Sequence, residues 1–315
     1  MADRAPNPLS HEFGSVPLVA NTGVQYKDPA DPRFELALAT AEGWRDADVP
    51  FVVVDSSPEE WPAAALRERG AVVLKATVGG IASQRQQAAA FSLASGAKTL
   101  VSAEPEKTLM PRFVPEITAG LLGNSALSIG RTPEAMRSLP PVQRRTETLG
   151  GWVFEQLLGL PADQWSGGRA FTDVGAYNLE HYPFEKPGMN NWIWLYKTML
   201  DSRAEGLPVG GITIDLQHPA SMVEEETGNR VFDMKRYAQF ALQVRWAAAQ
   251  PQVAENPRAQ EISDLLIRGL DILPTEPTKE QYEVYFKVME DQLAPYGYLT
   301  PEMLDKAALL DASRS

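Results

Sequence analysis

The sequence contains no cysteine, which excludes disulfides, thiolate metal sites and cysteine nucleophiles. It also has only three histidines in 315 residues, so a metal site would depend mainly on carboxylates, the hard oxygen ligands that suit Mg²⁺ or Mn²⁺. No apolar run is long enough to span a bilayer, and the first residues lack the basic and apolar segments of a secretory signal. We therefore expect a protein without stable membrane insertion, located in the cytoplasm.

Clustered positive charge and glycine-rich nucleotide motifs are missing too. The net charge of -12 argues against a general nucleic-acid surface, because phosphate backbones attract clustered Lys and Arg. The segment after the first predicted strand, 21–34, carries neither a Rossmann fingerprint nor a Walker A motif. A dinucleotide-dependent enzyme and a P-loop ATPase are therefore disfavoured, and the glycine-rich basic loop typical of nucleotidylyltransferases is also absent.

Short apolar runs rich in β-branched residues alternate with longer helical patterns. The predicted strands cover 16–21, 50–56, 71–76, 98–104 and 126–130. The helical patterns between the first four of them cover 34–47, 58–70 and 81–96. This alternation predicts an α/β fold with a mostly parallel sheet flanked by helices. Ligands of such sheets bind at the carboxyl ends of the strands, where Asp55, Lys75 and Glu104 lie.

The last third has a different pattern. Amphipathic helices are predicted at 234–250, 261–273 and 281–297, with proline-containing connectors between them. The predicted organisation is a flexible N-terminal tail at 1–15, an α/β domain at 16–250 and a helical extension at 251–315. The extension either packs back on the core or forms a homodimer contact.

The order of these segments resembles the nucleotide-binding half of the GT-A glycosyltransferases, the nucleotide-diphospho-sugar transferases. The stretches that carry the resemblance are PLVANTG, VVVDSSPEEW and VVLKATVGGIASQRQQAAAFSLASGAKTLVSAEPEK. In that family the second strand ends in an acidic residue near the nucleoside, and a Lys/Gly/Gly…Arg stretch opens a helix. The resemblance implies a GT-A-like fold in which Asp55, Lys75, Gly80 and Arg85 bind the nucleotide sugar.

The segment Glu104-Pro105-Glu106 occupies the position of the family's Asp-x-Asp metal motif. Carboxylates that flank one residue can reach the same divalent ion, and the ion would bridge the donor diphosphate. The resemblance adds His218, at the end of a predicted strand, as a third metal ligand. Because glutamate carries an extra methylene, Lys107 could instead supply part of the positive charge. The alternative is an ordinary surface loop that caps the following helix.

The resemblance places further donor contacts between residues 165 and 193. Gly167 and Gly168 would line the donor-sugar pocket, and Arg169 would hold the diphosphate or an acceptor anion; the alternative is a turn with a solvent-facing arginine. Inverting members carry an acidic pair where this chain has Asn190 and Asn191. An amide cannot accept a proton, so the resemblance implies a retaining mechanism with both amides on donor-sugar hydroxyls.

These observations predict metal-assisted transfer of a hexosyl group from a UDP- or GDP-sugar to a small soluble acceptor, with Mn²⁺ or Mg²⁺ as cofactor. Two alternatives stay open: a nucleotidylyltransferase of related fold, and a catalytically decayed protein that only binds sugar nucleotides. Release of nucleoside diphosphate in the presence of Mn²⁺ separates them, because binding alone yields no free nucleoside diphosphate.

Overall fold

The computed structural model describes residues 18–161 and 163–305. The chain forms two compact units and passes from one to the other at residues 132/133, 165/166 and 222/223. We call residues up to 132 together with 166–222 the α/β unit, and 133–165 together with 223 onward the helical unit. The predicted tail at 1–15 lies outside the described residues. The predicted boundary after residue 250 does not coincide with a division between the units, because 133–165 and 223–250 belong with the later helices.

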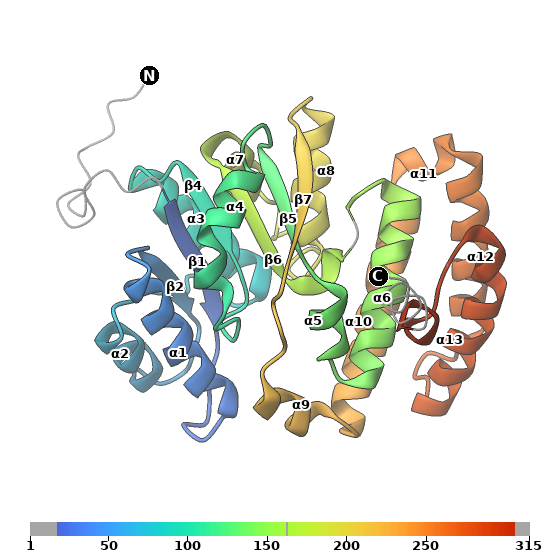
Figure 1. The fold of residues 1–315 in the computed structure, drawn as a ribbon, viewed down its shortest axis with the longest axis horizontal. Helices are drawn as coiled ribbons and strands as arrows, with labels where there is room; N and C mark the ends of the chain where they lie inside the picture. The colour runs from blue at the N-terminus through green and yellow to red at the C-terminus, as the bar shows by residue number, and fades with distance from the viewer. Residues whose placement is uncertain (1–17, 162, 306–315) are drawn as a thin grey trace, which may run out of the picture. The chain divides into compact units, whose positions relative to one another are not determined.

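A seven-stranded sheet forms the centre of the α/β unit (Figure 1). Its strands are β1 (Leu18–Val24), β2 (Phe51–Asp55), β3 (Val72–Lys75), β4 (Thr99–Ser102), β5 (Ala126–Arg131), β6 (Gly168–Thr172) and β7 (Val209–Ile214). Their order is β3-β2-β1-β4-β6-β5-β7, and only β6 runs antiparallel to its neighbours. The predicted mostly parallel α/β sheet is therefore confirmed, while β6 and its direction were not predicted.

The helices of the α/β unit follow the predicted alternation. They are α1 (Pro32–Asp46), α2 (Trp61–Glu68), α3 (Ile81–Ala94), η2 (Met110–Phe113), α4 (Val114–Gly120), α7 (Asp173–Glu180) and α8 (Trp194–Ala204), and α9 (Ala220–Glu226) contains the division at 222. Asp31 caps α1 by accepting from the Arg33 N–H. Pro32 suits the first position of the helix because a backbone N–H there, which proline lacks, would have no acceptor within the helix. Phe34 and Trp44 of α1 are buried in the apolar core against the sheet.

One face of this sheet is apolar and the other carries a polar row. On the apolar face, alternate strand residues such as Ala20, Val53 and Val101 join the core that includes α1. On the opposite face, four buried polar residues are neighbours in register on β1, β4, β6 and β5: Asn21, Ser102, Arg169 and Ser128. The unit therefore buries polar side chains inside the fold and not only at the strand ends.

The strand order reverses beside β1. The chain runs outward from β1 to β2 and β3, and then returns to place β4 on the other side of β1. In open α/β sheets, the crevice outside the carboxyl ends of strands at such a switch point is where ligands bind. The residues that follow β1 and β4 are therefore the first place to look for a site.

The helical unit has no strand among its described residues. Its helices are α5 (Pro133–Arg137), α6 (Pro141–Leu158), α10 (Arg230–Ala248), α11 (Pro251–Glu255), α12 (Pro257–Ile272), α13 (Lys279–Leu293) and η4 (Ala294–Tyr296), and η3 (Gln164–Ser166) contains the division at 165. The three amphipathic helices predicted from periodicity are found as α10, α12 and α13. Aromatic rings of α10 and α13 pack together, with Tyr237 and Tyr282 stacked at 5.0 Å. No helix in the described part of the chain is long and apolar enough to cross a membrane.

Candidate functional site

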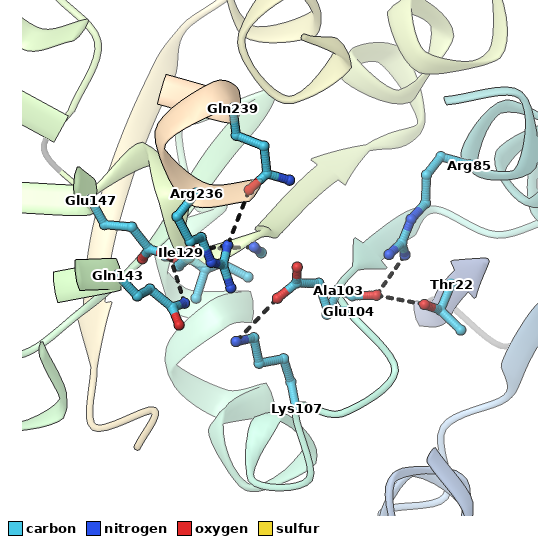
Figure 2. Close-up of polar contacts among 12 residues, drawn as sticks. Thr22, Arg85, Ala103, Glu104, Lys107, Ile129, Gln143, Glu147, Arg236 and Gln239 are labelled. Carbon is cyan, nitrogen blue, oxygen red and sulfur yellow. Dashed lines mark hydrogen bonds and ion pairs between the residues drawn. The ribbon is translucent and has the colours of Figure 1, made fainter. Parts of the chain in front are cut away.

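The loop that follows β4 is fixed to its neighbours by hydrogen bonds to one carbonyl group. We call residues 103–107 the acidic loop. The carbonyl oxygen of Ala103 accepts from Thr22 Oγ1 at 2.8 Å and from Arg85 Nη1 at 2.5 Å, and the Ala103 N–H donates to the Asn21 carbonyl at 3.2 Å (Figure 2). These bonds hold the start of the acidic loop at the switch point between β1 and β4.

Arg85 is completely buried and extends from α3 to the strand ends. Besides the Ala103 carbonyl, its Nη1 donates to the Asn21 carbonyl at 2.9 Å and to Ser102 Oγ at 3.3 Å. Burial lowers the pKa of Arg85 to about 10, although the charges of Glu104 and Glu106 act in the opposite direction. The guanidinium is therefore charged at neutral pH. Its described bonds go to the backbone and to Ser102 at the strand ends, while its buried Nε and Nη2 have no hydrogen-bond partner among the described residues.

Glu104 and Lys107 form an ion pair within the acidic loop (Figure 2). The distance from Lys107 Nζ to Glu104 Oε2 is 3.1 Å, and the Lys107 side chain is only 5% exposed. Gly167 has φ +78°, and a Cβ placed on it would lie 2.9 Å from the Glu104 Cδ. A side chain at position 167 would therefore collide with the carboxylate, so the predicted glycine has a clear role beside Glu104.

Glu106 lies in the same electrostatic environment. Burial raises the pKa of the Glu106 carboxyl and the charge of Glu104 raises it further, while Lys107 and Arg33 lower it in part. Two carboxylates and one lysine thus share this end of the sheet. The ionised form of Glu106 would be favoured by any additional cation placed beside the pair.

The predicted metal triad was tested against this arrangement. Among the described residues, no group of three or more His, Asp or Glu side chains lies close enough together to hold a metal ion. His218 is buried beyond β7 and does not complete such a group with Glu104 and Glu106. The two carboxylates fit a hard divalent cation if its remaining ligands are donor phosphates and water, as is usual for Mg²⁺. The described residues therefore bring no third His, Asp or Glu side chain to Glu104 and Glu106, and metal binding by these two residues stays a prediction.

The end of β2 contributes a buried carboxylate. Asp55 is 1% exposed, and its Oδ1 accepts from the Ser57 N–H at 2.8 Å. Its Oδ2 is buried and has no hydrogen-bond partner among the described residues. Lys75, at the exposed end of β3, donates from Nζ to the Ser57 carbonyl at 2.6 Å. Asp55 therefore retains an acceptor for a ligand N–H or O–H, whereas Lys75 is bound to the loop after β2.

Tyr26, which was not predicted as a site residue, is a buried phenol affected by the charges of both Asp55 and the acidic loop. Burial raises the pKa of Tyr26 well above its usual value, and the negative charges of Glu106, Asp31 and Asp55 contribute to the rise. Its backbone N–H donates to Ser57 Oγ at 2.8 Å. Its hydroxyl donates to the Arg33 carbonyl at 3.4 Å. Its place just after β1 was the signal that could have identified it.

Asn190 caps helix α3 across the fold. Its Oδ1 accepts from the N–H groups of Ala82 and Ser83, both at 3.1 Å, and its Nδ2 donates to the Gly79 carbonyl at 2.9 Å. Gly80 has φ +118°, and a Cβ placed there would lie 2.4 Å from Asn190 Nδ2. The amide therefore serves the helix start, where the resemblance implied donor-sugar hydroxyls.

Asn191 has a local role. Its Nδ2 donates to the Gly188 carbonyl at 2.6 Å, and its Oδ1 accepts from the Ile193 N–H at 2.8 Å. Such bonds stabilise the turn that leads into α8. Both amides of the Asn190-Asn191 pair are thus engaged with backbone groups.

Arg169 and Gly168 lie inside the α/β unit. Arg169 is completely buried, and it donates from Nε to the Leu195 carbonyl at 3.0 Å and from Nη1 to the Gly168 carbonyl at 2.6 Å. The alternative of a solvent-facing arginine is therefore wrong, and these bonds are not those of the implied anion contact. A Cβ on Gly168 would lie 3.1 Å from Ile129 Cβ, so this glycine permits close packing and does not open a pocket.

No protein-family model and no curated protein matches the sequence. Solved structures do resemble it. One is glucosyl-3-phosphoglycerate synthase from Mycobacterium tuberculosis in complex with phosphoglyceric acid, at 12% identity and a TM-score of 0.44, covering 73% of this chain and 82% of that one. The same synthase in complex with Mn²⁺, UDP-glucose and glycerol 3-phosphate gives 13% identity and a TM-score of 0.42, with 75% and 86% covered.

Another match is a putative nucleotide-diphospho-sugar transferase from Desulfovibrio desulfuricans G20, at 7% identity and a TM-score of 0.39, covering 62% of this chain and 79% of that one. The matches include the class of protein that the sequence resembles. Similarity at this level assigns neither a ligand nor an activity to this chain.

Proposed function

We propose that this protein is a glycosyltransferase that takes its sugar from a nucleotide diphosphate donor, with the diphosphate bound beside the acidic loop. The observation that carries the proposal is the place of Glu104 and Glu106. Both follow β4 at the switch point of an open sheet, on a loop whose first carbonyl is held by Thr22 and Arg85. Ligands of such sheets bind at this place.

The electrostatics of the loop favour a cation there. The buried ammonium group of Lys107 pairs with Glu104 and also acts by charge on Glu106. The pKa of Glu106 is nevertheless raised by burial and by the charge of Glu104. A bound Mn²⁺ or Mg²⁺ would supply the charge that stabilises the departing diphosphate. Glu104 and Glu106 would hold that ion, and the backbone of Gly167 leaves room for the Glu104 carboxylate.

Asp55 supports a nucleoside site next to the acidic loop. Its buried Oδ2 is an acceptor without a partner among the described residues, and such an atom favours a ligand that brings an N–H or O–H group. Asp55 ends β2 beside Val24 at the end of β1, so the nucleoside region would adjoin the switch point at which the acidic loop begins. Whether the base is uracil or guanine is decided by titration with both nucleotides.

We propose retention of the anomeric configuration and a small soluble acceptor. A general base must be able to accept a proton, and Asn190 and Asn191 carry amides that are bound to the backbone. The proton of the acceptor hydroxyl would then pass to the departing phosphate on the same face of the sugar. Analysis of the product by NMR, with the anomeric coupling as readout, distinguishes retention from inversion.

The experiment that tests the proposal is calorimetric titration of UDP and GDP, with and without Mn²⁺, into the wild type and Glu106→Ala. The matched control is Glu116→Ala, because Glu116 is an exposed glutamate of the same unit. We expect Mn²⁺-dependent binding in the wild type and the control, and a loss of about tenfold or more in Glu106→Ala, the equivalent of 1.4 kcal/mol. Failure of the wild type to bind either nucleotide would overturn the proposal.

A second measurement separates a transferase from a protein that only binds its ligand. The protein is incubated with the sugar nucleotide of the base that binds, with Mn²⁺ present, and free nucleoside diphosphate is measured. A transferase releases it by slow hydrolysis or on addition of an acceptor. Tight binding with no release under any acceptor would contradict enzymatic function while leaving the binding site in place.

A further inference from the structure

Lys107 pairs with the carboxylate that a divalent cation would use. Its Nζ is 3.1 Å from Glu104 Oε2, its side chain is 5% exposed, and Glu104 is the ion-pair partner that the described residues give it. An ammonium group carries three donors and no acceptor. Lys107 therefore satisfies the Glu104 carboxylate from inside the protein.

The backbone keeps the two side chains together. The Lys107 N–H donates to the Glu104 carbonyl at 3.2 Å, and the Met110 N–H donates to the Lys107 carbonyl at 3.0 Å. The Glu104 carboxylate also lies against the backbone of Gly167, because a Cβ there would lie 3.0 Å from Oε2. Lys107 and Gly167 thus both crowd the Glu104 carboxylate.

We infer that Lys107 competes with the divalent cation for Glu104, and that the donor diphosphate relieves this competition by accepting hydrogen bonds from Lys107 Nζ. The inference rests on the proposed function and concerns the same site. Two cations on one carboxylate repel each other, so Glu104 serves the metal well only when the ammonium group has another anion to pair with. The diphosphate supplies that anion.

Binding of metal and nucleotide is then coupled through one side chain. The metal alone must displace Lys107 from Glu104, and the diphosphate alone must approach a pair of carboxylates. When both bind, the metal pairs with the carboxylates and Lys107 pairs with the diphosphate. Each ligand therefore raises the affinity for the other by the same factor, as linkage requires.

The test measures free Mn²⁺ by electron paramagnetic resonance during titration of the wild type and Lys107→Met, each with and without the nucleoside diphosphate, UDP or GDP, that the calorimetry selects. Without nucleotide, we expect Lys107→Met to bind Mn²⁺ about tenfold more tightly than the wild type, since the competing charge is gone. The nucleotide should then raise the Mn²⁺ affinity of this variant much less than that of the wild type.

Two further variants serve as controls. Lys107→Arg keeps the charge and should behave as the wild type does. Lys98→Met removes an exposed lysine of the same unit, which pairs with Asp173, and should leave Mn²⁺ binding unchanged. Lys107→Gln repeats the measurement if the methionine variant does not fold.

The outcomes distinguish this inference from the proposed function. If the wild type binds Mn²⁺ with nucleotide, but Lys107→Met binds Mn²⁺ no more tightly than the wild type, the competition is refuted and the donor site stands. If the wild type binds no Mn²⁺ with either nucleotide, the two-carboxylate metal site fails and the inference fails with it. Equal coupling in the wild type and Lys107→Met also refutes the role of Lys107.

Discussion

Two buried carboxylates of the helical unit pair with cations of the same unit, whereas two buried arginines of the α/β unit donate to backbone carbonyls. In the helical unit, Glu147 is 1% exposed, accepts from Gln143 Nε2 at 2.7 Å and lies 3.6 Å from Arg236 Nη1 (Figure 2). Asp233 on α10 is likewise buried, and Lys279 on α13 donates to it at 2.6 Å. Each of these carboxylates has its own cation.

In the α/β unit two buried arginines donate hydrogen bonds to backbone carbonyls. Arg85 donates to the carbonyls of Asn21 and Ala103, and Arg169 donates to the carbonyl of Gly168. In the acidic loop, Glu104 pairs with Lys107, and burial together with the charge of Glu104 raises the pKa of Glu106. A closed pair stabilises a fold, whereas a buried carboxyl with a raised pKa, such as that of Glu106, is stabilised in its ionised form by an added cation.

The largest expected effect comes from Arg85→Met. The substitution removes the charged donor from the Asn21 and Ala103 carbonyls, which keep only the Ala103 N–H and Thr22 Oγ1 as donors, and we expect it to lower the free energy of unfolding by about 3 kcal/mol. The exposed Arg112 gives the control Arg112→Met, which should stay within about 0.5 kcal/mol of the wild type. Urea unfolding measures both. Equal stability of the two variants would show that Arg85 does not hold the strand ends.

A matched neutralisation in each unit sharpens the comparison. Glu147→Gln keeps the shape of the side chain but leaves Arg236 without its carboxylate, so we expect a loss of about 2 kcal/mol in the free energy of unfolding. Mn²⁺ binding at the acidic loop should be unaffected. A stability loss in Glu106→Gln as large as that in Glu147→Gln would remove the distinction between the two clusters.

The smallest expected effect is a pH dependence at Glu106. The pKa of Glu106 is raised in the folded protein, so between pH about 4.3 and the folded pKa the native state binds more protons than the unfolded state. The free energy of unfolding therefore falls as the pH rises through this range. Glutamine does not titrate, so Glu106→Gln should be more stable than the wild type above this pH range. Thermal unfolding without metal at pH 5 and pH 8 measures the gain, with Glu116→Gln as control. A relative stability of Glu106→Gln that is the same at both pH values would show that the Glu106 carboxyl is not perturbed.

Periodicity was sufficient for most of the fold. The alternation of β-branched runs and helical patterns predicted β1 to β5, and the 3.6-residue pattern predicted α10, α12 and α13. It could not predict β6, because Gly168–Thr172 contains a glycine and an arginine in place of an apolar run. The placement of Glu104 and Glu106 at a strand end was also predictable, since parallel strands bring their carboxyl ends to one edge.

The roles of individual polar residues were less accessible. The resemblance implied ligand contacts for Arg85 and Arg169, and the sequence pattern does not reveal the distant backbone carbonyls to which they donate. Asn190 caps a helix whose Ser83 lies 107 residues away in the chain. Local patterns carry no information on such pairings, so the amide was assigned to a ligand.

The bonds that Thr22 and Arg85 make to the Ala103 carbonyl have an evolutionary consequence. They tie the acidic loop to the folding of the sheet, so a descendant that lost sugar transfer would still be selected to keep both residues. Glu106 would be under no such constraint, because burial and the charge of Glu104 disfavour its ionised form, whereas Glu104 also pairs with Lys107. Among homologues, persistence of Thr22 and Arg85 would therefore report on folding, and persistence of Glu106 would report on chemistry.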